Sequence, residues 1–320
     1  MKIYLGIDAG GTSTDFSISD ENGHILIEDK CETIHIKQVS KDIIEKRLFT
    51  TINKMIQKIN SSIDNIECIF AGLPGFGEFP EVETLFTNLL KKLTGKNNFK
   101  LGNDCVSGWA GSQAAKPGVN MVLGTGSIAF GVDYKGNEER SSGWGPYCGD
   151  EGSGYWLGRE TIFLFGKESD GRAEKGALYK LIKEEFNLVK DFDFIQKVLE
   201  LNDDRTKIAD FSKLLTKAAN DGDKEAIKII KKAAYESAIA IKAVIEKLNF
   251  EDNEKIYISY SGGVFNIGKL LTDEISELLS DDERIEIIDS ILSPKRGSVL
   301  MALKNSGIDI TNEIVENLKG

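Results

Sequence analysis

Apolar and polar residues alternate at the start of the chain, which is typical of a sheet with one buried face. The alternation predicts a strand from Ile3 to Ile7, followed by strands at residues 15–19 and 24–27. Asn22-Gly23, between the last two strands, is a strong turn signal of β-hairpins. The chain is therefore predicted to begin with three strands that are joined by tight turns.

A change to helical spacing follows. Apolar residues recur every three or four positions between residues 41 and 59, which predicts an amphipathic helix. A short apolar strand at residues 68–71 leads into a Gly/Pro loop at 72–77. A second helix, at about 80–93, precedes a short strand that ends at 102–104. Strands separated by helices predict a mixed α/β sheet.

The opening pattern then recurs. A strand at 120–123, a Gly/Thr turn at 124–127, a strand at 128–134 and a hairpin signal at 135–137 repeat the N-terminal order. We interpret this as an internal structural repeat, although two unrelated hairpins would give the same signals.

The rest of the chain, after the Gly-rich stretch 143–158, is largely helical, and its longest predicted helix spans 223–248. A strand at 256–259 meets a third glycine turn, Ser261-Gly262-Gly263. A strand at 285–288 and a helix at 294–303 complete the pattern.

The length of 320 residues exceeds what one hydrophobic core usually serves, so two lobes are expected. We place the N-terminal lobe at residues 1–115, with a C-terminal helix at 296–320 packing back on it. The C-terminal lobe then spans residues 116–295.

Composition narrows the class of protein. The net charge of -11 argues against a nucleic-acid partner, which requires a basic surface. No apolar run approaches the roughly 18 residues of a membrane span, and no signal peptide is apparent. The four cysteines are too far apart to predict a disulfide framework or a zinc site. A cytoplasmic protein without membrane partners is expected.

The turn Gly10-Gly11-Thr12 follows the first strand. Backbone N–H groups of consecutive glycines and a threonine hydroxyl form a concave donor set that suits phosphate oxygens. Asp8 would repel phosphate directly, so we expect it to face a hydrated Mg²⁺ ion. The alternative is a tight hairpin without a ligand.

The second turn, Gly124-Thr125-Gly126, strengthens the phosphate interpretation because a polyphosphate held from two sides needs two such turns. Gly262 and Gly263 would let a flat base approach the backbone, or they only allow the turn from strand to helix. The fingerprints GxxxxGK[ST] and GxGxxG are absent, which excludes a P-loop or Rossmann nucleotide site.

Two acidic positions are candidates for chemistry. Asp104 lies where a strand ends, and a carboxylate there can accept the proton of an attacking hydroxyl. The alternative for Asp104 is helix capping. Asp150 lies in GWGPYCGDEGSGYW, whose small and acidic residues suit a pocket for a hydroxyl-rich ligand. The alternative is a compact loop that caps a helix starting near Ser153, with Trp144 and Trp156 in the core.

Together these motifs resemble the actin/Hsp70/hexokinase superfamily. GIDAGGTSTDFSI resembles its first phosphate loop, LGTGS its second and YSGGVFN its adenosine loop. GWGPYCGDEGSGYWLGRE and SPKRGSVLMAL are similar to the BadF/BadG/BcrA/BcrD ATPase family, in particular to its N-acetylglucosamine kinases. The resemblance implies an α/β, two-lobed, ribonuclease H-like fold with a duplicated core and a cleft between the lobes.

The resemblance also implies a reaction, the phosphorylation of an amino-sugar 6-hydroxyl by ATP with Mg²⁺, and it assigns roles to residues. Asp104 matches the base, Asp8 the residue near magnesium, and Ala209 and Gly263 the lining of the adenosine site. Thr12 and Thr125 match phosphate contacts. The sugar contacts implied by the family fall on Asp104, Ser127, Gly143, Trp144, Gly145 and Asp150.

One departure bears on the substrate. Where mammalian relatives have Thr-Asn-His, with an asparagine that binds a sugar hydroxyl, this chain has Thr33-Ile34-His35. The change would make room for a larger substituent, so N-acetylmuramic acid is an open second substrate beside N-acetylglucosamine. Family members are often dimers.

Four alternatives stay open. Glucosamine or another hexose is a different acceptor for the same chemistry. An activator ATPase of 2-hydroxyacyl-CoA dehydratases would need closely spaced cysteines, which this chain lacks. A sugar-sensing regulator that uses nucleotide as a switch would usually add a helix-turn-helix segment, for which 320 residues leave no spare domain. A filament subunit is the last alternative, and Asp104 with the pocket around Asp150 fits a small acceptor better than a polymer interface.

Overall fold

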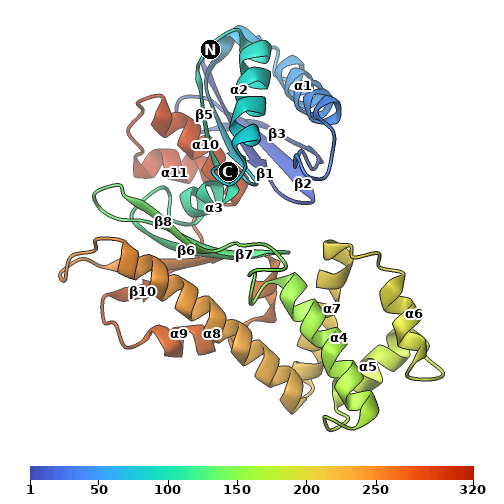
Figure 1. The fold of residues 1–320 in the computed structure, drawn as a ribbon. Helices are drawn as coiled ribbons and strands as arrows, with labels where there is room; N and C mark the ends of the chain where they lie inside the picture. The colour runs from blue at the N-terminus through green and yellow to red at the C-terminus, as the bar shows by residue number, and fades with distance from the viewer. The chain divides into compact units, whose positions relative to one another are not determined.

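The computed structural model describes residues 1–320 and divides them into two compact units (Figure 1). Unit 1 comprises residues 1–120 and 289–320, and unit 2 comprises residues 121–288. None of the helices is sufficiently long and apolar to span a membrane.

The sheet of unit 1 has the strand order β3-β2-β1-β4-β5. The pairs β1–β2 and β2–β3 are antiparallel, whereas β1–β4 and β4–β5 are parallel. The antiparallel part is the predicted pair of hairpins. The strands are β1 (Ile3–Ala9), β2 (Ser13–Ser19), β3 (Ile25–Glu32), β4 (Ile66–Leu73) and β5 (Phe99–Asn103).

Helices cover both faces of this sheet. Apolar residues of α1 and α2 share one buried core with Ile3, Leu5 and Ile7 of β1. The opposite side of β1 carries Gly6, and a Cβ there would lie 2.3 Å from the backbone nitrogen of Val299 in α10. Gly6 therefore lets α10 pack directly on the sheet. The helices are α1 (Lys41–Lys58), η1 (Ile63–Asn65), α2 (Pro80–Thr94), α3 (Asp104–Ser112), α10 (Pro294–Asn305) and α11 (Asn312–Lys319).

The C-terminal segment differs from the prediction of a single helix at 296–320. It forms two helices, α10 and α11, with residues 306–311 between them. Gly307 adopts a φ of +90°, which ends the first helix, and the side chain of Thr311 caps the second by accepting from the N–H of Ile314.

The sheet of unit 2 has the order β10-β9-β6-β7-β8. When its strands are counted in chain order, this is the same arrangement as in unit 1, with the first strand in the centre. The predicted duplication of the core is thus present in the topology. The strands are β6 (Gly118–Leu123), β7 (Ser127–Val132), β8 (Glu138–Ser142), β9 (Ile256–Ser261) and β10 (Ile285–Ile287).

Seven helical segments complete unit 2. Four of them, α4 to α7, follow one another between β8 and the long helix α8. The helices are α4 (Gly154–Asp170), α5 (Ala177–Glu185), α6 (Asp193–Leu199), α7 (Arg205–Asn220), α8 (Lys224–Lys247), η2 (Gly263–Ile267) and α9 (Lys269–Leu279).

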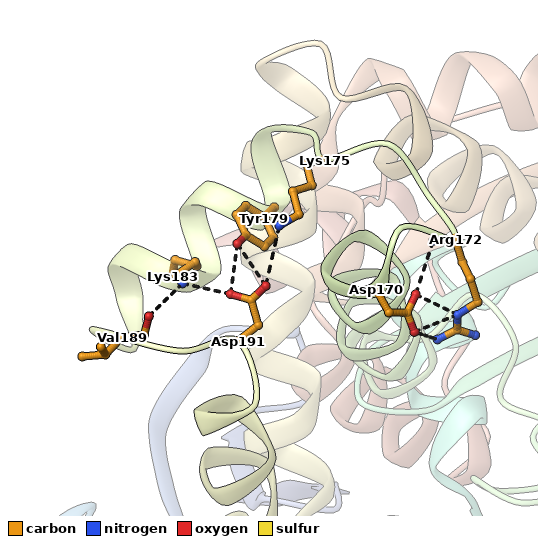
Figure 2. A network of polar contacts seen from close by, with 7 residues as sticks. All are labelled: Asp170, Arg172, Lys175, Tyr179, Lys183, Val189 and Asp191. Carbon is orange, nitrogen blue, oxygen red and sulfur yellow. Dashed lines mark hydrogen bonds and ion pairs between the residues drawn. The ribbon is translucent and has the colours of Figure 1, made fainter.

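An aromatic core holds α4 to α7 together. The rings of Phe165 and Phe194 are 4.6 Å apart, and Phe186 stacks on Phe211 at 5.4 Å. Figure 2 shows a polar network in which Asp191 accepts hydrogen bonds from Tyr179 at 3.0 Å and from Lys183 at 2.9 Å. The ring of Tyr179 also stacks on Phe165, at 5.6 Å. These contacts fix α7 against α4 and tie the α5–α6 connection to α5, which matters because α7 begins at the site described below.

Glu168 on α4 is fully buried. Its Oε1 accepts a hydrogen bond of 2.8 Å from the N–H of Gly176, and its Oε2 has no partner. The pKa of Glu168 is raised to about 7, mainly by burial and to a smaller extent by the charges of Asp223 and Glu225, against the opposing hydrogen bond from Gly176. The folded protein therefore binds a proton at Glu168 that the unfolded chain releases above its ordinary pKa of 4.5.

This proton makes stability depend on pH. As the pH rises from about 5 to 8, the wild-type protein should lose up to about 3 kcal/mol because the buried carboxyl must ionise. Glu168→Gln keeps the acceptor for Gly176 but cannot ionise, so its melting temperature should fall less over this range. Thermal melts at several pH values measure the difference, and parallel curves for the two proteins would contradict the assignment.

Candidate functional site

The first predicted phosphate turn, Gly10 to Thr12, connects β1 to β2 in unit 1. Gly11 and Thr12 are exposed, and the N–H of Gly10 donates to the carbonyl of Ser13 at 2.8 Å. The segment after β3 supports the turn, because the hydroxyl of Thr33 donates to the carbonyl of Gly10 at 2.9 Å. The backbone of Gly10 is thus fixed by hydrogen bonds, while Gly11 and Thr12 stay accessible to solvent.

Asp104 is the first residue of α3, directly after β5. The helix cap is its neighbour Asn103, whose side chain accepts from the N–H of Cys105 at 3.2 Å. The capping alternative for Asp104 is therefore wrong. Gly72 of β4 makes the close packing here possible, since a Cβ on it would lie 3.4 Å from the Cα of Asp104 and 2.1 Å from the hydroxyl of Ser107.

Asp8 lies at the end of β1 and belongs to the same cluster. The pKa of Asp8 is raised to about 7, first by burial and then by the charges of Asp104 and Asp15, while a hydrogen bond with Ser107 lowers it. Each of the two carboxylates makes ionisation of the other less favourable, and a nearby cation would offset this repulsion. The structure thus brings together Asp8 and Asp104, two residues that the sequence placed 96 positions apart.

The second phosphate turn, Gly124 to Gly126, connects β6 to β7 in unit 2. The N–H of Gly154, at the start of α4, donates to the carbonyl of Gly124 at 2.8 Å, and the N–H of Tyr155 donates to Thr125 at 3.3 Å. The turn therefore rests on the N-terminus of α4, which Ser153 caps by accepting from Trp156.

The predicted adenosine residues lie against the same turn. Gly262 has a φ of +103°, and a Cβ there would lie 2.3 Å from the carbonyl oxygen of Leu123. A Cβ on Gly154 would be 3.4 Å from the side chain of Ala209 and 3.6 Å from that of Val264. The third glycine turn, α7 and the second phosphate turn therefore meet at one place in unit 2.

Within the three predicted ligand turns, three glycines have no explanation in the packing of the chain, a property that Gly166 of α4 shares outside the turns. Gly11, Gly124 and Gly263, one in each turn, all have a φ outside the left-handed region. A Cβ would meet nothing within 4 Å at Gly124 or Gly263, and only the end of the Gln38 side chain, 3.8 Å away, at Gly11. At these positions glycine leaves the main chain uncovered although a side chain would fit. This is expected where a ligand such as a phosphate approaches the main chain closely.

Asp150 lies beside the second phosphate turn and is only 4% exposed. Its Oδ2 would lie 3.1 Å from a Cβ on Gly126, and the N–H of Ser127 points to its Oδ1 at 3.5 Å. Burial raises the pKa of Asp150, while Arg205 and the N–H groups of Ser127 and Gly145 lower it. Three predicted sugar contacts, Ser127, Gly145 and Asp150, are therefore neighbours.

The Gly-rich loop before Asp150 stands partly in solvent. Trp144 is 77% exposed, so the alternative that placed it in the core is wrong. Gly143 and Gly145 both have positive φ values, and the side chain of Ile128 packs where Gly143 would carry a Cβ. The loop conformation thus depends on glycine at these two positions and presents Trp144 outward.

Sequence reasoning missed Arg205, the first residue of α7. Its Nη2 lies 2.7 Å from the Oδ2 of Asp150, and the two residues are 55 positions apart. No motif connects them, and the only signal in the sequence was a basic residue four positions before Ala209.

No group of three or more His, Cys, Asp and Glu side chains is close enough to hold a metal ion by itself. Asp8 therefore belongs to no cage of protein ligands, and a Mg²⁺ ion near it stays a prediction. All four cysteines are free thiols, of which Cys68 and Cys105 are buried and Cys148 is exposed.

The paired five-stranded sheets and glycine turns define the class, the two-lobed, actin-like fold of sugar kinases. Residues 5–302 match the BadF/BadG/BcrA/BcrD ATPase family, and the chain belongs to that family, as the sequence predicted.

Two curated relatives match almost end to end. The chain is 29% identical over 303 residues to N-acetylmuramic acid/N-acetylglucosamine kinase of Clostridium acetobutylicum, covering 94% of this chain and 98% of that protein. It is 29% identical over 315 residues to N-acetyl-D-glucosamine kinase of Dictyostelium discoideum, covering 95% and 98%.

Solved structures share the fold. A Chromobacterium violaceum protein described as an N-acetylglucosamine kinase has a TM-score of 0.73 at 21% identity, covering 94% of this chain and 99% of that one. A ROK family glucokinase from Streptomyces griseus, in complex with glucose and AMPPNP, has a TM-score of 0.57 at 16% identity, covering 94% and 98%.

Proposed function

We propose that this protein is an ATP-dependent kinase that phosphorylates the 6-hydroxyl of N-acetylglucosamine and also accepts N-acetylmuramic acid. The observation that carries the proposal is the set of three bare glycines, Gly11, Gly124 and Gly263, one in each turn. The names of both curated relatives, which match nearly the whole chain, support the amino sugar as acceptor.

In the proposed reaction, unit 1 supplies the base. Asp104 accepts the proton of the sugar 6-hydroxyl as the hydroxyl oxygen attacks the terminal phosphorus of ATP. The bond from that phosphorus to the bridging oxygen breaks, and ADP leaves with the bridging oxygen. The N–H of Gly11 and the hydroxyl of Thr12 bind phosphate oxygens. Gly10 shapes the turn, because its N–H is bonded to the carbonyl of Ser13. Mg²⁺, when bound with ATP, would neutralise phosphate charge, and Asp8 is the residue that would orient it through water.

Unit 2 supplies the nucleotide and sugar contacts. Gly124, Thr125 and Gly126 bind phosphate, and Ala209 with Gly262 and Gly263 lines the adenosine site. Asp150, Ser127 and the loop Gly143 to Gly145 bind the sugar hydroxyls. Asp150 serves this role because its carboxylate is buried and directly beside the phosphate turn.

The segment Thr33-Ile34-His35 supports the broader substrate range. Ile34 is fully buried, so the position at which relatives place an asparagine offers no polar contact to a sugar. The backbone of Thr33 is bonded to the first turn, because its N–H donates to the carbonyl of Thr12 at 3.2 Å.

A coupled ADP-release assay over a panel of amino sugars tests the proposal. N-acetylglucosamine and N-acetylmuramic acid should stimulate ADP release well above the sugar-free rate, and 6-deoxy-N-acetylglucosamine should not, because it lacks the acceptor oxygen. If no sugar stimulates release, the kinase proposal fails. If only N-acetylglucosamine does, the broader range fails.

A further inference from the structure

Asp150 has a charged partner that lies outside its own motif. Its backbone adopts a φ of +60°, in the left-handed region that non-glycine residues rarely occupy. The N–H of Ser153 donates to the backbone carbonyl of Asp150 at 3.1 Å, which fixes the turn but not the direction of the side chain. The carboxylate is instead oriented by Arg205, whose Nη2 is 2.7 Å from its Oδ2.

Arg205 is itself held in place. The central carbon of its guanidinium group lies 5.5 Å from the centre of the Tyr155 ring, and that ring is buried. A guanidinium group on an aromatic face gains from the cation–π interaction and loses rotational freedom. Since Tyr155 and Arg205 come from α4 and α7, the packing of these two helices sets where the positive charge stands.

The positive charge has a specific consequence for a buried carboxylate. The groups that face Asp150 are Arg205 and the N–H groups of Ser127 and Gly145. Burial raises the pKa of Asp150, and Arg205 is the one full charge among the groups that lower it. An ionised carboxylate accepts hydrogen bonds with both oxygens, whereas a protonated one loses part of that capacity.

We propose that Arg205 is the positioning residue of the sugar site, which keeps Asp150 ionised and turned so that its Oδ1 accepts hydrogen bonds from sugar hydroxyls. The inference rests on the proposed function, because it assigns Asp150 to the sugar. Arg205 acts through Asp150 and is not in contact with the reacting atoms.

Arg205→Met tests this inference, with steady-state kinetics at pH 6, 7 and 8.5. The KM for N-acetylglucosamine should rise at least about tenfold at pH 7, the range expected for loss of one charged hydrogen bond. The increase should be largest at pH 6 and smallest at pH 8.5, because without Arg205 the pKa of Asp150 rises further. The KM for ATP should stay within about twofold.

Three further variants make the result specific. Arg205→Lys keeps the charge and should restore most of the sugar affinity. Adding Arg205→Met to Asp150→Asn should cause little further loss, because the two residues act as one unit. Arg159→Met is the matched control: Arg159 lies 5.8 Å from the same Tyr155 ring but has no carboxylate partner, so its sugar KM should stay within about twofold.

The outcomes separate the two levels of inference. A wild-type enzyme that no sugar stimulates overturns the proposed function and the role of Arg205 with it. An active wild type whose Arg205→Met variant resembles Arg159→Met overturns only the role of Arg205. A loss of sugar affinity that is independent of pH, or that Arg205→Lys does not repair, also overturns it, because it would reflect packing alone.

Discussion

Replacing Asp104 by Asn is expected to lower kcat by at least ~10²-fold while leaving ATP affinity unchanged. Asparagine has the shape of aspartate but cannot accept the proton of the sugar hydroxyl. Because Asn103 and not Asp104 caps α3, the substitution removes no helix cap, so the fold should be unaffected. The kcat from ADP release at saturating substrates, together with a binding measurement for ATP, checks both halves of the expectation.

The control for this variant is Asp15→Asn. Asp15 lies opposite Asp8 in the β1–β2 pair and, like Asp104, raises the pKa of Asp8 by its charge. It has no proposed role as base. If the fall in kcat came only from the loss of a negative charge near Asp8, both variants would have a low kcat. The assignment of Asp104 as the base predicts a low kcat for Asp104→Asn alone. An Asp104→Asn enzyme of wild-type rate would show that the base is misassigned.

Gly158→Ala is expected to destabilise unit 2 by about 3 kcal/mol or more, because the helices α4 and α7 cross at this residue. A Cβ on Gly158 would lie 1.9 Å from the carbonyl oxygen of Ile208 and 3.3 Å from the Cα of Ala209. Since these are backbone atoms, relief requires the helices to separate. That movement would also displace Arg205 and Ala209, so sugar and ATP affinity should fall together.

Gly166→Ala is the matched control in the same helix. A Cβ there would meet nothing within 4 Å, so the substitution should stabilise α4 by up to about 1 kcal/mol through helix propensity. Chemical denaturation of both variants measures the contrast. A Gly158→Ala protein as stable as Gly166→Ala would mean that the α4–α7 crossing tolerates a methyl group.

Much of the fold was predictable because the signals are local. The strand and helix bounds follow from apolar periodicity, as in the helix predicted at 80–93 and observed as Pro80–Thr94. The duplication followed from the repeated turn chemistry. The C-terminal segment was predicted less well, because the break at Gly307 and the cap at Thr311 lie inside a stretch whose pattern is otherwise helical.

The candidate site was predictable in part. Composition alone predicts the glycine turns. Asp104 and Asp150 are candidates because each lies beside a turn in the sequence. The cap at Asn103 was not predicted, because Asn103 and Asp104 can both cap a helix and only packing decides between them. For Trp144 the sequence left a sugar contact and a core position open, and its exposure excludes the core position.

The sequence by itself determined the elements, the repeated glycine turns and the acidic residues that follow them, because each depends on residues within a few positions of one another. The tertiary structure alone decided which of these meet. The pairing of Asp150 with Arg205 depends on the angle at which α4 and α7 cross, and the clustering of Asp8 with Asp104 on the parallel order of β1, β4 and β5. Such contacts join residues dozens of positions apart, and no local pattern encodes the geometry between them.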